Sequence, residues 1–261
     1  MAEERYERIE VTQAGAARTL TLAYPERRNA IGPLMTNELL YALESARADP
    51  SVRVVVLTGK GKAFCAGGDF SQMSGGGAAG ALPHKGDYKD LLVALFRSKK
   101  PVIARVNGHA MGGGLGIVAA STFAVASTDA KLGTPEIDVG LFPMMIMAVL
   151  ARLMTRRRLV EMMLLGQKLT AEEARAAGIV GKVVPPEALD GAVHELAEAL
   201  ASKSGATMRL GLTAIADAED LELDLALPLL RERLGACFAT EDAREGLSAF
   251  LEKRAPKWTD R

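Results

Sequence analysis

The segment from Pro101 to Ser121 constrains the fold of this chain most. A short β-branched run leads there into three consecutive glycines, Gly112 to Gly114, and then into an apolar helical pattern. Glycine alone adopts positive φ freely and lets a backbone approach another group this closely. A helix that begins at such glycines presents unpaired N–H groups and partial positive charge. We expect a buried strand that turns into a helix whose first amides can hold an anion, although plain helix–strand packing uses glycines equally well.

Composition limits the class of protein. The 261 residues suffice for one large domain or a domain with an appendage, and 49% of them are hydrophobic, which excludes a disordered chain. Lys+Arg and Asp+Glu balance at 32 each, so charge gives no reason to expect nucleic acid or an anionic membrane as partner. No segment resembles a signal peptide or is long enough to span a bilayer. Two cysteines cannot build a disulfide framework, so a cytoplasmic protein is expected.

Short β-type runs alternate with helical patterns, which favours an α/β architecture. The β-type runs cover residues 18–23, 52–58, 101–106 and 123–127. From Leu189 onward the pattern is almost wholly helical. We therefore expect a core of residues 1–200 and a helical C-terminal region of residues 201–261. The glycine- and alanine-rich segment 74–86 is interpreted as a lid over a pocket or an inert surface insertion.

Several motifs, in this order along the chain, resemble those of the enoyl-CoA hydratase/isomerase (crotonase) superfamily. They cover residues 63–69, 107–114, 131–143, 165–180 and 245–254. The resemblance spans nearly the whole chain. It implies a spiral of β-β-α repeats, followed by a helical region through which such chains assemble as a homotrimer or a dimer of trimers. It also implies a coenzyme A thioester as substrate, with no separate cofactor.

The resemblance assigns the anion-holding amides to Gly68 and Gly113. Enolising a thioester places negative charge on its carbonyl oxygen, and losing one preorganised donor to that oxygen typically raises the barrier by about 3 kcal/mol. Ala66 and Asp69 flank the first donor and are expected to contact the substrate. By its motif position, Asp69 more plausibly orients the loop than transfers a proton.

The proton-transfer groups depart from the pattern of the hydratases in this family, which use two glutamates to add water. The first glutamate follows the glycine triplet by two residues, where this chain has Gly116. The second corresponds to Glu136. Burial at a strand–helix junction would raise the pKa of Glu136 and make it a competent base near neutral pH. The alternative is a surface or ion-paired glutamate.

A single carboxylate favours a proton shuttle from C2 to C4 of a 3-enoyl thioester over hydration. Where hydratases carry a glycine-rich run, this chain has Met144, Met145 and Met147. We expect these side chains to line the acyl pocket and exclude water, the alternative being ordinary helix core. Double-bond isomerisation is thus the favoured reaction. Enoyl-CoA hydration or dehydration and a non-catalytic acyl-CoA-binding role are the alternatives.

Coenzyme A contacts are implied by resemblance at both ends of the chain. Residues 26–31 match a segment that lies near the adenine and phosphates, which implies contacts from Arg28 and Ala30. Phe250 and Lys253 match C-terminal positions that reach the coenzyme A of a neighbouring subunit. The alternative for these two is the surface of an amphipathic helix.

Other chemistry-bearing residues fit structural roles better. Cys65 is interpreted as a buried packing residue, and His109 as a hydrogen-bonded structural residue rather than a second acid or base. Met144 stands where the dehalogenase branch of the family carries a nucleophilic aspartate, which argues against that chemistry. No group of residues has the spacing of metal ligands.

Overall fold

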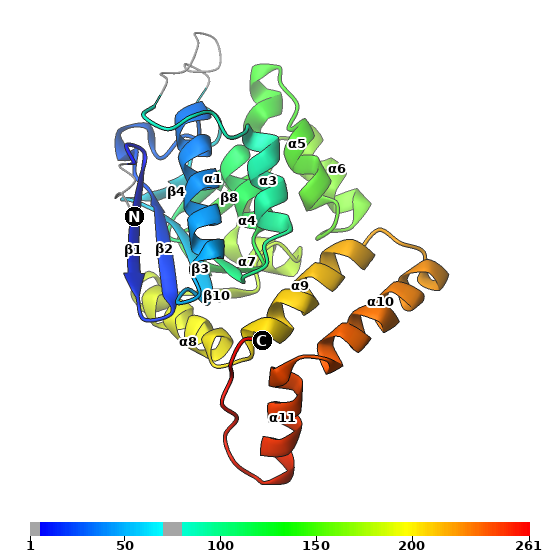
Figure 1. Ribbon diagram of the computed structural model, residues 1–261. Helices are drawn as coiled ribbons and strands as arrows, with labels where there is room; N and C mark the ends of the chain where they lie inside the picture. The colour runs from blue at the N-terminus through cyan, green and yellow to red at the C-terminus, as the bar shows by residue number, and fades with distance from the viewer. Residues whose placement is uncertain (1–5, 70–79) are drawn as a thin grey trace.

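The protein folds around two stacked sheets (Figure 1), and the structure, a computed structural model, describes residues 6–69 and 80–261. The larger sheet has six strands, in the order β1 (Ile9–Ala14), β2 (Ala17–Leu22), β3 (Val54–Gly59), β5 (Val102–Val106), β7 (Phe123–Ser127) and β10 (Lys182–Val184). The smaller has four, in the order β4 (Ala63–Cys65), β6 (His109–Met111), β8 (Lys131–Gly133) and β9 (Lys168–Thr170). All pairs are parallel except β1–β2 and β8–β9.

The expected β-β-α repeat is visible in this topology. The strand pairs β3–β4, β5–β6 and β7–β8 each place their first strand in the larger sheet and their second in the smaller one. A helical segment follows each pair: α3 (Tyr88–Phe96), α4 (Gly113–Ala120) and the 3₁₀ helix η2 (Pro135–Val139). The second strands therefore end side by side, and the residues that follow them meet at one edge.

Helices cover both faces of the larger sheet because its strands are apolar on both sides. Along β3, Val55 and Leu57 join the main core beneath α1 (Pro33–Ala48), α3 and α4, whereas Val54 and Val56 face α8 (Leu189–Ala201). Alternate residues of a strand point to opposite faces, so one β-branched run serves both cores. The remaining helices of this part are α5 (Met144–Leu150), α6 (Arg156–Leu164) and α7 (Ala171–Ala176), with the short 3₁₀ helices η1 (Pro25–Arg27) and η3 (Pro186–Ala188).

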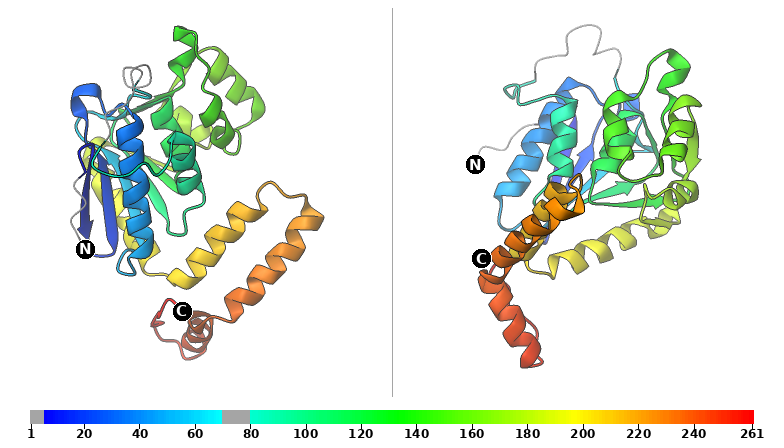
Figure 2. Two further views of the ribbon diagram at one scale, coloured as in Figure 1. Left: turned by 45° about the horizontal axis from the view of Figure 1, so that its top comes forward. Right: turned by 90° about the vertical axis from the view of Figure 1, so that its right-hand side faces the viewer.

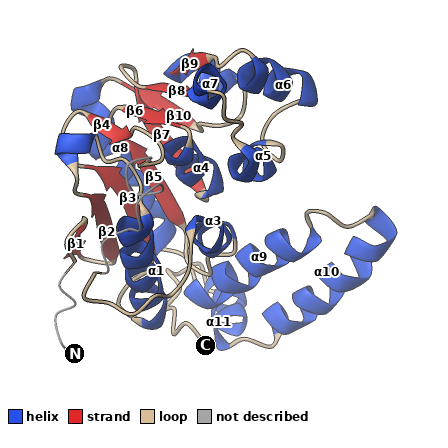
Figure 3. Ribbon diagram, turned by 90° about the horizontal axis from the view of Figure 1, so that it is seen from above, coloured by secondary structure: helices blue, strands red, loops and turns tan. Residues whose placement is uncertain are grey.

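The C-terminal region is helical, as expected, and projects away from the sheets (Figure 2). It consists of α9 (Gly205–Ala218), α10 (Leu223–Phe238) and α11 (Glu241–Leu251), and α9 and α10 run side by side as an antiparallel pair (Figure 3). Large apolar side chains are exposed along it: Ile215, Leu223, Leu225, Leu227, Leu234, Phe238, Leu247, Phe250 and Leu251. The division at residue 200 and the assembly through this region stay predictions.

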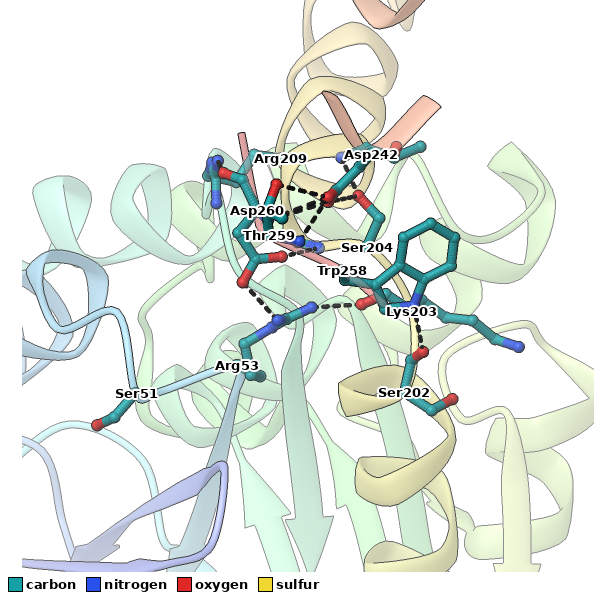
Figure 4. Close-up of polar contacts among 12 residues, drawn as sticks. Ser51, Arg53, Ser202, Lys203, Ser204, Arg209, Asp242, Trp258, Thr259 and Asp260 are labelled. Carbon is teal, nitrogen blue, oxygen red and sulfur yellow. Dashed lines mark hydrogen bonds and ion pairs between the residues drawn. The ribbon is translucent and has the colours of Figure 1, made fainter. Parts of the chain in front are cut away.

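The C-terminal tail returns to the sheets through a polar network (Figure 4). The Arg53 guanidinium, beside the start of β3, pairs with Asp260 at 2.5 Å. Asp242 of α11 is buried and accepts hydrogen bonds from the Ser204 hydroxyl and the Thr259 amide. Burial alone would raise the pKa of Asp242, but these hydrogen bonds hold it below its usual range. The network fixes the helical region to the core.

No helix in the described part of the chain is both long and apolar enough to cross a lipid bilayer.

Asn29 ties the turn after β2 to the strand that leads to the glycine motifs. It is fully buried and has a left-handed backbone, with φ +57°. Its Nδ2 donates to the carbonyls of Lys60, Ala63 and Phe64 at 2.9–3.3 Å. Its Oδ1 accepts from the Tyr24 amide. One side chain thus bonds four backbone groups, and its contacts with the Ala63 and Phe64 carbonyls are buried.

We expect Asn29→Ala to lower the free energy of unfolding by about 3 kcal/mol, because buried polar groups left without partners cost this much together. Arg28→Ala is the matched control, since Arg28 is also left-handed, with φ +52°, but its side chain is exposed. Urea denaturation of both variants checks the difference. Equal losses of unfolding free energy in the two variants would show that the left-handed backbone, and not the hydrogen bonds of Asn29, determines the cost.

Candidate active site

The glycine triplet lies where the expected strand-to-helix turn occurs, between β6 and α4. Gly112 has φ +48° and donates its amide to the Gly133 carbonyl at 2.9 Å. A Cβ on Gly112 would overlap Oε1 of Glu136 and lie 3.0 Å from its Cδ. Glycine is required here twice, for the backbone angle and for the approach of the carboxylate. The turn therefore brings Glu136 against the start of α4.

A second turn, after β4, lies beside the first. Gly67 has φ +106°, and a Cβ on it would lie 3.3 Å from the Met111 carbonyl. Ile31 clamps this turn, donating to the Gly67 carbonyl and accepting from the Asp69 amide. A Cβ on Gly113 would lie 3.1 Å from Ile31 Cγ2, so the same residue contacts the turn after β4 through its backbone and the glycine triplet through its side chain.

The hydrogen bonds of Ile31 do not involve the amides of Gly68 and Gly113, the two expected oxyanion donors. Neither the Gly68 amide nor the Gly113 amide donates a hydrogen bond to any residue that the structure describes. Gly113 is the first residue of α4, where an amide has no partner within the helix. The structure thus brings both turns together with free N–H groups, the arrangement that an oxyanion requires. Their joint action on one oxygen stays a prediction.

Glu136, the predicted base, lies at the end of the smaller sheet beside the start of α4. It belongs to η2, directly after β8, and is half-buried. Its Oε2 is inaccessible to solvent and has no hydrogen-bond partner among the described residues. Burial raises the pKa of Glu136, and a hydrogen bond from its own backbone offsets this only in part. A carboxylate with a raised pKa and one oxygen that no described residue satisfies is suited to accept a proton from carbon.

The space beside Gly116 is filled. A Cβ there would overlap the Tyr88 hydroxyl oxygen and lie 2.5 Å from Cγ2 of Ile146. The Tyr88 hydroxyl donates to the Gly113 carbonyl at 2.5 Å. Burial raises the pKa of Tyr88 well above its usual value, and the nearby Cys65 and Glu136 add to the effect, so the phenol is neutral. Sequence reasoning missed Tyr88, because it belongs to no motif and meets Gly116 only through the fold.

The methionine run does not face Gly116 as a group. Met144, Met145 and Met147 are 64%, 50% and 39% exposed, whereas Ile146 is 3% exposed and packs against Gly116. Met145 lines a cavity of about 360 Å³ between α3, α5 and α9. The buried residue that this helix contributes beside Gly116 is Ile146, and the acyl-pocket role of the three methionines stays a prediction.

A cationic cavity adjoins the turn after β4. It measures about 450 Å³ and is lined by Arg28, Lys131 and Lys168, together with Ala66 and His109 among others. None of the three cations forms an ion pair with a carboxylate in residues 6–69 or 80–261. Sequence reasoning named Arg28 but missed the two lysines, which the β8–β9 pairing brings together.

The other predicted contacts lie in two places. Ala30 lies in the turn after η1, beside Ile31, and Asp69 is buried with its amide held by Ile31. Phe250 is 80% exposed in α11, and Lys253 is exposed just after that helix. In Figures 1 and 2 α11 lies at the opposite end of the molecule from β8 and α5. These two residues therefore do not reach Glu136 of their own chain.

The remaining candidates have structural partners. Burial raises the pKa of Cys65 to about 12, so this residue is a thiol and no nucleophile at neutral pH. His109 Nδ1 accepts a hydrogen bond from the Lys131 amide at 3.1 Å. The segment 74–86, interpreted from sequence as a lid or an inert insertion, lies in part outside the described residues. Across the described residues, no three His, Cys, Asp or Glu side chains cluster closely enough to hold a metal ion.

Comparison with known proteins identifies the family. A sequence model of enoyl-CoA hydratase/isomerase matches residues 12–261. The chain is 32% identical to crotonyl-CoA hydratase of Syntrophomonas wolfei (95% of this chain, 96% of that protein) and 33% identical to 2,3-dehydroadipyl-CoA hydratase of Escherichia coli (93% and 94%). The crystal structure of an enoyl-CoA hydratase from Mycobacterium smegmatis matches with a TM-score of 0.88 and 33% identity, over 97% of this chain and 99% of that one. The expected fold is confirmed, and the chain belongs to the enoyl-CoA hydratase/isomerase family.

Proposed function

We propose that this enzyme isomerises 3-enoyl-CoA to 2-enoyl-CoA through an enolate, with Glu136 moving the proton. The observation that carries this proposal is the filled space at Gly116. Tyr88 and Ile146 occupy the volume into which the first hydratase glutamate would project, so position 116 supplies neither a carboxylate nor room for one. The proton shuttle needs only one carboxylate.

The steps follow from the positions of the groups. Glu136 takes a proton from C2, and the electron pair of that C–H bond moves into the thioester, placing negative charge on its oxygen. The amides of Gly68 and Gly113 stabilise this charge, each contributing about 3 kcal/mol to lowering the barrier. The protonated Glu136 then returns the proton at C4, and the double bond shifts from C3–C4 to C2–C3. No atom is gained or lost, and no water takes part.

The cationic cavity supports binding of the coenzyme A phosphates. Arg28, Lys131 and Lys168 lie together beside Ala66, which adjoins the Gly67–Gly68 turn. Three cations that form no ion pair with any described carboxylate create a positive potential suited to phosphate groups. The exposed apolar surface of α9–α11 supports a second element of this proposal, a homotrimer or a dimer of trimers in which neighbouring chains cover that surface.

Hydration is the second candidate, and the names of the relatives favour it. Proteins 32% and 33% identical to this chain are named crotonyl-CoA hydratase and 2,3-dehydroadipyl-CoA hydratase. Hydration by this chain would require a group other than residue 116 to share the work of Glu136 on the water.

Absorbance of the conjugated enoyl thioester separates these reactions. We expect the protein to generate that band from 3-hexenoyl-CoA and to leave it unchanged in crotonyl-CoA. Glu136→Gln should slow isomerisation by about 10²–10⁴-fold, the range for losing a general acid–base group. Glu187→Gln is the matched control, because Glu187 is exposed in η3. Loss of the crotonyl-CoA band would establish hydration instead, and inertness of all three proteins with retained coenzyme A binding would establish a non-catalytic role.

The raised pKa of Glu136 predicts a pH-dependent stability difference. A carboxyl whose pKa is higher in the folded than in the unfolded chain destabilises the fold once it ionises, so the penalty appears as the pH rises through the unfolded value. Glu136→Gln removes that penalty. The variant should therefore melt above the parent at pH 8, with the gap closing toward pH 4. Thermal unfolding of both proteins from pH 4 to pH 8 measures this difference in melting temperature. A difference that does not change with pH would contradict the burial of an ionised Glu136.

A further inference from the structure

Tyr88 is held at both ends. It is the first residue of α3, whose N-cap, Asp87, accepts from the Lys89 and Asp90 amides, while the Asp90 side chain accepts from the Asp87 amide. This capping box fixes the backbone from which the ring projects. At the other end, the hydroxyl is bound to the Gly113 carbonyl. The ring is therefore fixed between α3 and α4 without a substrate.

The Tyr88 hydroxyl is protonated and cannot activate water as a base. Its pKa is raised by burial, so the phenol keeps its proton at neutral pH, and it donates that proton to Gly113. A neutral phenol is too weak a base to take a proton from water. What it does supply is volume, because its oxygen lies where a side chain on residue 116 would begin.

We propose that Tyr88 determines the reaction specificity of this enzyme by keeping water out of the space beside Gly116. A water molecule needs about 30 Å³ and two to four polar partners. Here the Tyr88 hydroxyl and Ile146 take the volume, and the Gly113 carbonyl already accepts a hydrogen bond from that hydroxyl. The enolate formed at Glu136 is then reprotonated and no hydroxyl is added. Tyr88 is a positioning residue in this proposal, which rests on the isomerase function above.

The test is the product ratio from 3-hexenoyl-CoA, measured by chromatography as 3-hydroxyacyl-CoA over 2-enoyl-CoA. Tyr88→Ala opens the space and should raise this ratio at least tenfold. Tyr88→Phe removes only the hydroxyl and keeps the ring, so it should raise the ratio by less than Tyr88→Ala does. A merely structural role would lower total turnover in Tyr88→Ala but would not move the ratio.

A carboxylate placed in the opened space gives a second readout. Gly116→Glu in the Tyr88→Ala background should hydrate crotonyl-CoA at least tenfold faster than either single variant. Gly116→Glu alone should gain little, because the phenol still fills the space. Circular dichroism confirms that each variant is folded, and oxygen-18 water identifies the added hydroxyl.

Two results overturn the proposal while leaving the isomerase function intact. One is an unchanged product ratio in folded Tyr88→Ala, together with no gain in crotonyl-CoA hydration when Gly116→Glu is added to it. The other is a loss of isomerisation of 10²-fold or more in Tyr88→Phe, which would make the hydroxyl itself a proton-transfer group. Failure of the isomerase function has a separate signature, since it appears in the parent protein as hydration of crotonyl-CoA, and it overturns both.

Discussion

The close packing of the glycine backbone at the start of α4 against β4 and against Glu136 is the constraint on which the rest of the site depends. A Cβ on Gly114 would lie 2.6 Å from Cβ of Cys65, and one on Gly112 would overlap Glu136. These contacts draw β4, α4 and η2 together at the edge where the second strands of the repeats end. The Gly68 and Gly113 amides are thereby left without partners among the described residues, at the point where Glu136 is half-buried. One packing requirement thus brings together the groups that we propose as oxyanion donors and base.

Burial and hydrogen bonding affect the pKa values of Asp242, Glu136 and Tyr88 in different ways. Asp242 is buried with several donors, so its pKa falls and its charge holds the C-terminal tail in place. Glu136 is buried with an Oε2 that no described residue satisfies, so its pKa rises. Burial raises the pKa of Tyr88 and keeps the phenol neutral, and its hydroxyl donates a hydrogen bond to the Gly113 carbonyl. Partners make a buried acid structural, and their absence makes it reactive.

Sequence alone predicted what lies within single motifs. The strand–glycine–helix segment, the alternation of strands and helices, and the position of Glu136 after β8 all depend on neighbours along the chain. Tyr88 could not be found this way, because it is 28 residues from Gly116 and meets it only when α3 packs on α4. Lys168 likewise joins Lys131 only through the antiparallel β8–β9 pair. The sequence indicated the methionines and not Ile146 as lining residues, because composition does not show which side of a short helix faces the interior.

Gly116, Tyr88 and Ile146 are best understood as one packing unit. A glycine at position 116 with smaller neighbours would leave a cavity in the tightly packed interior beneath α4, and such cavities are costly. The phenol and the isoleucine fill that volume, and the fixed N-cap of α3 lets them do so without rearrangement. The same contacts make the missing carboxylate hard to regain, since any side chain at 116 must first displace the hydroxyl from Gly113. Under the proposed function, packing and reaction specificity are therefore coupled, because a carboxylate at position 116 needs the space that Tyr88 and Ile146 occupy.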